Sequence, residues 1–174
     1  DVPVNLRNYF HSDTARNFFG VIKVGYNFSE GPGTLEDVIR QVREEFAREL
    51  TADQLGARMA ALSKAEHNYV ARVVPLVLKD IILRTADRIN EAYMAGSISN
   101  IGKIEMPQVA QPYVRRFDVF VSTEKLQACV CSYGSELTVS FTSAFRSTNV
   151  QKNFFRQLTA AGIPVEIQSN KMED

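Results

Sequence analysis

The stretch that decides the fold occupies residues 126–143 and reads LQACVCSYGSELTVSFTS. Two runs of strand-forming residues flank Gly134 and Ser135, and a two-residue link that begins with glycine is typical of a type II′ β-hairpin. With a link of this length, Val130 lies opposite Val139, and the register of the whole hairpin follows. The sequence therefore predicts two antiparallel strands joined by a tight turn.

The two faces of this hairpin differ in character. One face pairs Val130 with Val139 and Ala128 with Phe141, so it is apolar and belongs to a core. The other face pairs three residues of each strand: Cys131 with Thr138, Cys129 with Ser140, and Gln127 with Thr142. Its side chains are small and mildly polar but carry no charge, which indicates a half-buried surface that something else covers.

The rest of the chain mixes strand and helix patterns. Strands are predicted over residues 2–6, 19–28, 97–102, 114–121 and 165–167, where apolar residues alternate or form short runs. Helices are predicted over 34–50, 51–67, 70–93 and 149–161, with Thr34, Thr51 and Asn149 as their start signals. This order favours one α/β domain, a two-layer sandwich with a mixed, largely antiparallel sheet and helices on one face.

The helix predicted over residues 70–93 is unusually apolar. Its leucines, isoleucines and valines cover more than one face, as in a helix that is buried on two sides or packs against something outside the chain. Lys79, Arg84 and Arg88 fill the remaining face. A solvated face is the preferred interpretation of these three cations, and an anion site is the alternative.

Composition limits the classes of function. The chain has 174 residues, and its 20 basic residues balance 20 acidic ones without a block of like charge. Nucleic-acid binding therefore has little support, and no apolar run approaches the length needed to span a bilayer. Cys129 and Cys131 are two residues apart on one strand, which places their Cα atoms about 6.5–7 Å apart, at or beyond the limit for a disulfide, and favours free thiols in a reducing cytosol. No Cys/His quartet is present to bind a metal ion.

Four short motifs then follow one another along the chain. They are PVNLR at residues 3–7, RNFFG at 16–20, SISNIG at 97–102 with Pro107 after it, and NFFRQL at 153–158. Their order resembles the C-terminal half of the chloramphenicol-acetyltransferase-like superfamily, which includes alcohol acetyltransferases, wax-ester synthases and condensation domains of peptide synthetases. The resemblance covers nearly the whole chain and is nearest to the alcohol-acetyltransferase-like branch.

This resemblance implies an enzyme of two similar halves with its active site in a tunnel between them. The second histidine of a His-His-x-x-x-Asp-Gly motif is then the general base, which accepts a proton from a hydroxyl or amine that attacks a thioester. The motif is absent here, and the two histidines, His11 and His67, are not adjacent. Since the chain begins with Asp1 and not Met, we expect residues 1–174 to be the C-terminal half of a longer protein, without a catalytic base of its own.

The implied partners follow from the same resemblance. The N-terminal half of the same protein is the first, and a small-molecule acyl donor and acceptor are the others. Acyl-coenzyme A is expected as a co-substrate of the full-length protein, and no cofactor is expected to be bound by this chain alone. A homo-oligomer through the exposed surface between the halves is a further possibility.

Two sets of site residues are implied. The candidate tunnel lining comprises Ser97, Ser99, Asn100, Gln127, Cys129 and Cys131. Ser97, Ser99 and Asn100 would donate hydrogen bonds to the substrate or to a developing oxyanion. The alternative for Ser99 and Asn100 is that they bond backbone groups where the strand meets a loop. Arg7 and Asn17 are candidates for the joint between the halves, although Arg16 stands where related families have glycine. A surface ion pair is the alternative for Arg7.

Two other functional classes stay open at this stage. The first is a binding or assembly module that keeps the half-fold without the chemistry, with the small-residue face of the hairpin as its partner surface. The second is a small enzyme that uses His11. An exposed loop histidine and a helix C-terminal histidine are the preferred interpretations of His11 and His67.

Overall fold

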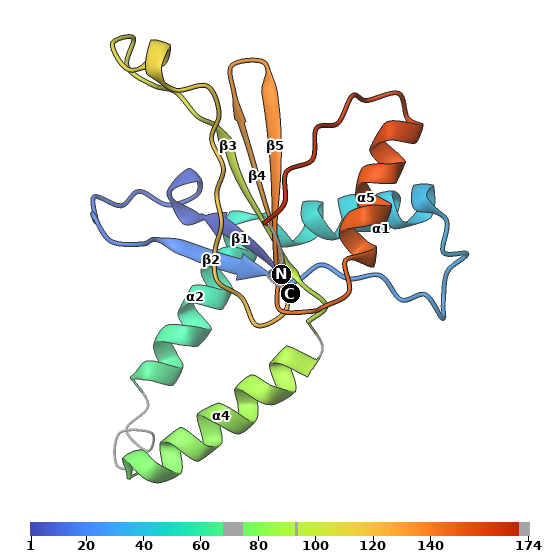
Figure 1. Cartoon of the computed structure of the whole chain (residues 1–174). Helices are drawn as coiled ribbons and strands as arrows, with labels where there is room; N and C mark the ends of the chain where they lie inside the picture. Colours follow the sequence, from blue (N-terminus) through green and yellow to red (C-terminus); the bar gives the residue numbers. More distant parts are fainter. Residues whose placement is uncertain (68–74, 93, 171–174) are drawn as a thin grey trace.

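The computed structural model of the chain describes residues 1–67, 75–92 and 94–170 (Figure 1). Helices and strands are mixed along the described residues, so the prediction of an α/β protein is confirmed. In chain order the elements are β1 (Val2–Asn5), the 3-10 turn η1 (Leu6–Asn8), β2 (Phe19–Ile22), α1 (Leu35–Glu49), α2 (Ala52–Glu66), α4 (Leu76–Ala92), β3 (Ser97–Lys103), the 3-10 turn η2 (Gln111–Tyr113), β4 (Leu126–Tyr133), β5 (Glu136–Ser143) and α5 (Asn149–Ala160).

Strands β4 and β5 form the predicted hairpin. Val130 pairs with Val139, and every other cross-strand pair given above is also observed. Gly134 occupies the turn with a φ of 59°, a left-handed conformation that favours glycine. The apolar face of the hairpin lies against α5, because the Phe141 ring meets Phe154 and Phe155 edge to face at centroid distances of 5.3 and 5.8 Å.

The strands form two small sheets that meet at one corner. Strands β1 and β2 pair antiparallel, while β3 pairs parallel with β4 in the sheet β3-β4-β5. At the corner, the Ile98 N–H donates to the Asp1 carbonyl at 2.9 Å, and the Asp1 amine donates to the Gly96 carbonyl at 2.9 Å. Strands β1 and β3 therefore begin side by side and then diverge, as Figure 1 shows.

Three predicted strands are absent or shorter than expected. β2 ends at Ile22, because α1 side chains bind the backbone beyond it: the Gly25 N–H donates to Glu45 at 2.8 Å. Residues 114–121 form no strand and contact β4 through side chains, with Phe117 edge to face on Tyr133 at 5.2 Å. Residues 165–167 form no strand either. These segments have strand composition, but a strand also needs an available partner edge.

Most of the predicted helix-capping residues are observed at the helix starts. Thr34 caps α1 by accepting from the Asp37 N–H at 3.3 Å, and Thr51 caps α2 by accepting from the Gln54 N–H at 3.3 Å. The predicted cap Asn149 is wrong by one position, since Thr148 precedes the helix and Asn149 is its first residue. For the helix predicted over 70–93, α4 covers 76–92, while residues 70–74 and 93 lie outside the described residues.

The buried core of the described residues is small. Leu6, Ile22 and Leu55 form one cluster between the β1–β2 sheet and α2, and Ala128, Cys129 and Cys131 are buried in β4. The chain exposes 14191 Å² of surface. A compact monomer of 19.5 kDa would expose about 8500 Å². Much of this structure therefore lies open to solvent.

Helix α4 is the clearest example of this exposure. It extends away from both sheets in Figure 1, and the side chains of Leu76, Ile81, Ile82 and Leu83 are each more than half exposed. The described part of the chain supplies nothing that covers this apolar surface. None of the helices in the described ranges is both long enough and apolar enough to cross a membrane.

Candidate functional site

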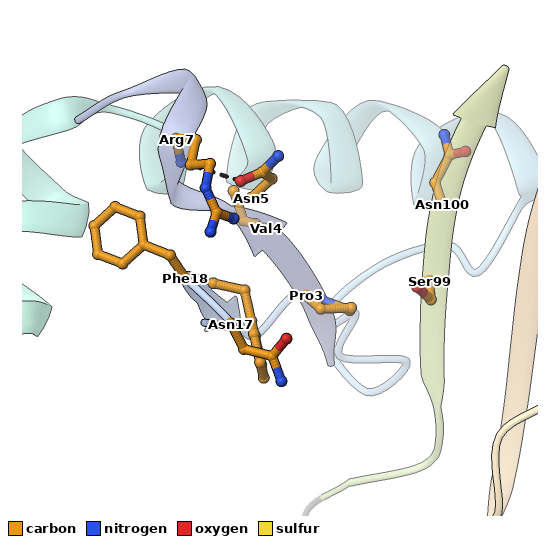
Figure 2. Close-up of a pocket in the computed structure, with 9 residues that line it drawn as sticks. Pro3, Val4, Asn5, Arg7, Asn17, Phe18, Ser99 and Asn100 are labelled. Carbon is orange, nitrogen blue, oxygen red and sulfur yellow. Dashed lines mark hydrogen bonds between the residues drawn. The ribbon is translucent and has the colours of Figure 1, made fainter. Parts of the chain in front are cut away.

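A groove opens where β1 and β3 diverge. Its volume is about 260 Å³, and β1, η1, the loop before β2, and β3 line it (Figure 2). Four predicted site residues line this groove: Arg7, Asn17, Ser99 and Asn100. They come from three separate segments of the sequence, and the corner at Asp1 and Ile98 brings them to one place.

Arg7 is held by backbone carbonyls of its own loop. Its Nη2 donates to the carbonyl of Thr14 at 2.8 Å and to that of Arg16 at 2.7 Å. The guanidinium also lies over the Phe18 ring, 6.0 Å from the ring centroid. Within residues 1–67, 75–92 and 94–170, no carboxylate lies within ion-pair distance of Arg7, so the predicted alternative of a surface ion pair is not what fixes this side chain.

Two asparagines of the groove make the same kind of contact. Asn100 accepts from the Gly102 N–H at 3.0 Å, and Asn5 accepts from the Arg7 N–H at 3.1 Å. Asn100 thereby supports an irregularity in β3, where the pairing with β4 shifts between Asn100 and Gly102 and Gly102 has a φ of 81°. The predicted backbone-bonding role of Asn100 is confirmed. Since an amide oxygen accepts in each case, both NH₂ groups remain as donors.

The other predicted lining residues lie outside this groove. Gln127, Cys129 and Cys131 are on β4, and Ser97 begins β3 beside Gln127. Both cysteines are buried and free, as predicted from their spacing. The Cys131 thiol donates to the Phe117 carbonyl at 3.4 Å, and burial raises its pKa. The segment around Phe117 therefore covers part of the small-residue face of the hairpin.

Neither histidine belongs to the groove. His11 lies in an exposed loop, with Nε2 3.8 Å from Asp13 Oδ1, and its side chain is 88% exposed. His67 lies just beyond α2, where its Nδ1 is 2.8 Å from the Ser63 carbonyl. Both positions agree with the preferred interpretations of these residues. The described residues also contain no group of three His, Cys, Asp or Glu side chains placed to hold a metal ion.

Five residues of the groove were not predicted as site residues: Pro3, Val4, Asn5, Phe18 and Phe19. All of them lie within the PVNLR and RNFFG motifs, so these motifs were the available signal. The alternating direction of backbone hydrogen bonds along β1 explains why a proline is tolerated at position 3. The Leu6 N–H donates to Phe18, so the even residues of β1 bond β2 and the odd ones face β3. Pro3 is thus on the edge that β2 does not use, where its missing N–H costs no ladder bond.

The groove has the chemistry of a binding site. Its lining includes a guanidinium, three asparagines and a serine, but no histidine, cysteine or carboxylate. These groups can hold and polarise a ligand, whereas general acid–base catalysis near neutral pH would need a titratable group from elsewhere. No protein-family model, curated protein or solved structure matches this chain.

Proposed function

We propose that this chain is the C-terminal half of an acyltransferase. The complete protein would move an acyl group from coenzyme A or a carrier-protein thioester to a hydroxyl or amine. In this proposal the groove between β1 and β3 is part of one wall of the tunnel. The general base is a histidine from the N-terminal half, because the groove itself contains no titratable base.

One observation carries the proposal. Four of the eight site residues that the resemblance implies, namely Arg7, Asn17, Ser99 and Asn100, line one groove although they come from distant parts of the sequence. Ser99 is the best candidate to donate a hydrogen bond to the reacting carbonyl oxygen. Arg7 and Asn17 would position the joint with the other half, and Asn100 would shape the wall through its bond to Gly102.

The exposed surface agrees with a missing half. The chain exposes 14191 Å², well above the roughly 8500 Å² of a compact monomer of its size. A second half would cover the open groove and complete a two-layer sandwich with helices on one face of a joined mixed sheet. The free thiols of Cys129 and Cys131 fit a reducing cytosol, where we expect the full-length protein to work.

The test is an acyl-thioester turnover assay on the full-length gene product. We expect turnover to be lost when the second histidine of the upstream His-His-x-x-x-Asp-Gly motif is changed to alanine, and to fall about tenfold or more in Ser99→Ala. Ser143→Ala, a hydroxyl on β5 outside the groove, is the matched control and should keep its activity. A gene that encodes no such motif upstream of Asp1 would rule the proposal out.

A non-catalytic binding or assembly module is the second candidate. The exposure of Leu76, Ile81, Ile82 and Leu83 on α4 favours it, because a large apolar patch on a stable protein usually marks a contact with another molecule. Sedimentation of the chain with and without a separately expressed N-terminal half distinguishes the two. A self-associating chain that ignores the N-terminal half supports the module, and a specific one-to-one complex supports the acyltransferase.

A further inference from the structure

Several hydrogen-bond donors of the groove have no partner among the described residues of the chain. Asn5 and Asn100 each have their amide oxygen bonded to a backbone N–H, at 3.1 and 3.0 Å, which leaves the NH₂ group of each. Arg7 bonds carbonyls through Nη2 alone, so the N–H groups on Nε and Nη1 remain. These unpaired donors favour a ligand that is rich in acceptors.

The charge of the groove is positive. Arg7 is its cation, no carboxylate is among its lining residues, and no carboxylate of the described chain lies within ion-pair distance of Arg7. The two carbonyl contacts of the guanidinium and its position over the Phe18 ring restrict its motion. A restricted guanidinium loses less side-chain entropy on binding an anion than a mobile one.

The remaining walls are apolar. Pro3 and Val4 line the groove from β1, and Phe18 and Phe19 line it from the start of β2. The volume of about 260 Å³ suits a small organic molecule. Figure 2 shows Ser99 and Asn100 on β3 across the groove from Arg7 and Asn17, so a ligand can meet donors on both sides.

From these observations we propose that the groove binds a small organic carboxylate. The carboxylate accepts hydrogen bonds from Arg7 and the asparagine NH₂ groups, and its hydrocarbon part lies on Pro3, Val4 and Phe18. This inference goes beyond acyl transfer, since it concerns a ligand that the chain binds without another half. Binding by the isolated chain and turnover by the full-length protein are separate measurements, so either can fail alone.

The test uses sodium hexanoate and the ¹⁵N-labelled chain in an NMR titration at pH 7.5. We expect saturable shifts with a dissociation constant in the millimolar range, because a solvent-accessible ion pair is weak. The uncharged hexanamide should bind at least about tenfold more weakly. Equal binding of hexanamide would overturn the proposal, and so would the absence of saturable shifts with hexanoate.

The variant Asn100→Asp tests whether the NH₂ group of Asn100 contributes to hexanoate binding. An aspartate keeps the acceptor for the Gly102 N–H and nearly the same shape, but it replaces the NH₂ donors with a negative oxygen. We expect hexanoate binding to weaken about tenfold or more while the spectrum stays that of a folded chain. Asn27→Asp is the matched control, since Asn27 accepts from the Ser29 N–H at 3.1 Å in the same way but lies outside the groove.

Two results would contradict this assignment. In the first, Asn27→Asp and Asn100→Asp weaken binding equally, which would show a response to net charge and not to the groove. In the second, inorganic phosphate displaces hexanoate with equal or higher affinity, which would show that the apolar walls contribute nothing and the ligand is an inorganic anion. Hexanoate binding that phosphate displaces only at far higher concentration supports the carboxylate.

Discussion

The hairpin β4–β5 and the helix α4 are both rich in apolar residues, but they differ in what lies against them. Every residue of β4 pairs with one of β5, and Phe141 packs against two rings of α5. On α4, by contrast, Leu76 is 80% exposed. The hairpin finds its partners within a few tens of residues along the chain, whereas the exposed apolar side chains of α4 have no such cover among the described residues. An apolar pattern therefore predicts that a segment will be covered, but not by what.

The largest expected effect is in the hairpin. Phe141→Ala removes the ring that meets Phe154 and Phe155, and we expect it to lower the free energy of unfolding by about 2–3 kcal/mol, less than for a fully buried phenylalanine. Urea unfolding followed by circular dichroism measures this. Phe120→Ala is the matched control: Phe120 is 65% exposed, and its loss should cost less than about 0.5 kcal/mol. Equal losses would show that the hairpin is no better packed than the exposed segments.

The next effect is in the hairpin turn. Gly134→Ala places a Cβ at a φ of 59°, so we expect a loss of about 1 kcal/mol in the same unfolding measurement. Gly25→Ala is the control, because Gly25 has open space for a Cβ and no positive φ. A turn variant as stable as this control would mean that pairing along the strands, and not the turn, determines the register.

The third expected effect is at the start of helix α1, where the contribution to stability depends on pH. The Tyr26 hydroxyl donates to Asp37 at 2.5 Å, and this bond, followed by the one from Arg40, lowers the pKa of Asp37. A carboxylate with a lowered pKa contributes stability above its unfolded pKa of about 4, and this stability is lost as pH falls through the folded pKa. We expect Tm to fall between pH 7 and pH 3, and to fall by a few degrees less in Tyr26→Phe.

The control for this pH effect is Tyr113→Phe. Tyr113 is 86% exposed, so its loss should leave the acid response of Tm as in the unaltered chain. The same hydrogen bond to Asp37 raises the pKa of Tyr26, so its contribution is present at neutral pH and is lost as pH rises through that raised pKa. An acid response that is identical in all three proteins would show that the Tyr26–Asp37 bond does not hold the start of α1.

The smallest expected effect is on α4. Ile82→Gln should change the free energy of unfolding by less than about 0.5 kcal/mol, because Ile82 is 55% exposed and has little packing to lose. Sedimentation should at the same time show no more self-association than in the unaltered chain, since an apolar group has been removed. A loss of more than about 1 kcal/mol would mean that α4 packs within the chain as tightly as the hairpin does.

The sequence predicted those parts of the fold whose partners are local. The hairpin register follows from a two-residue link, and Thr34 and Thr51 bond amides three positions ahead. Residues 114–121 are also rich in strand-forming residues but form no strand. Whether such a segment joins a sheet depends on which edges are left by distant elements, and no short pattern contains that information.

For the candidate site, local sequence likewise predicted individual residues but not the groove that they line. The motifs singled out Arg7, Asn17, Ser97, Ser99 and Asn100, because each lies in a distinctive local sequence, and all of these except Ser97 line the groove. The groove that collects them depends on the pairing of Asp1 with Ile98, which is a contact between distant residues. Gln127 and both cysteines share a face of β4, as predicted, but none of the three lines the groove, and residues near Phe117 cover part of that face.

The meeting of β1 and β3 also has a consequence for how quickly the chain folds. The hairpin closes a loop of two residues and can form within microseconds. The contact of Asp1 with Ile98 must close a loop that contains β2, α1, α2 and α4. The chain loses the entropy of closing this loop before any contact can offset the loss. We therefore expect the groove to be among the last features to form during refolding, well after the hairpin has its native register.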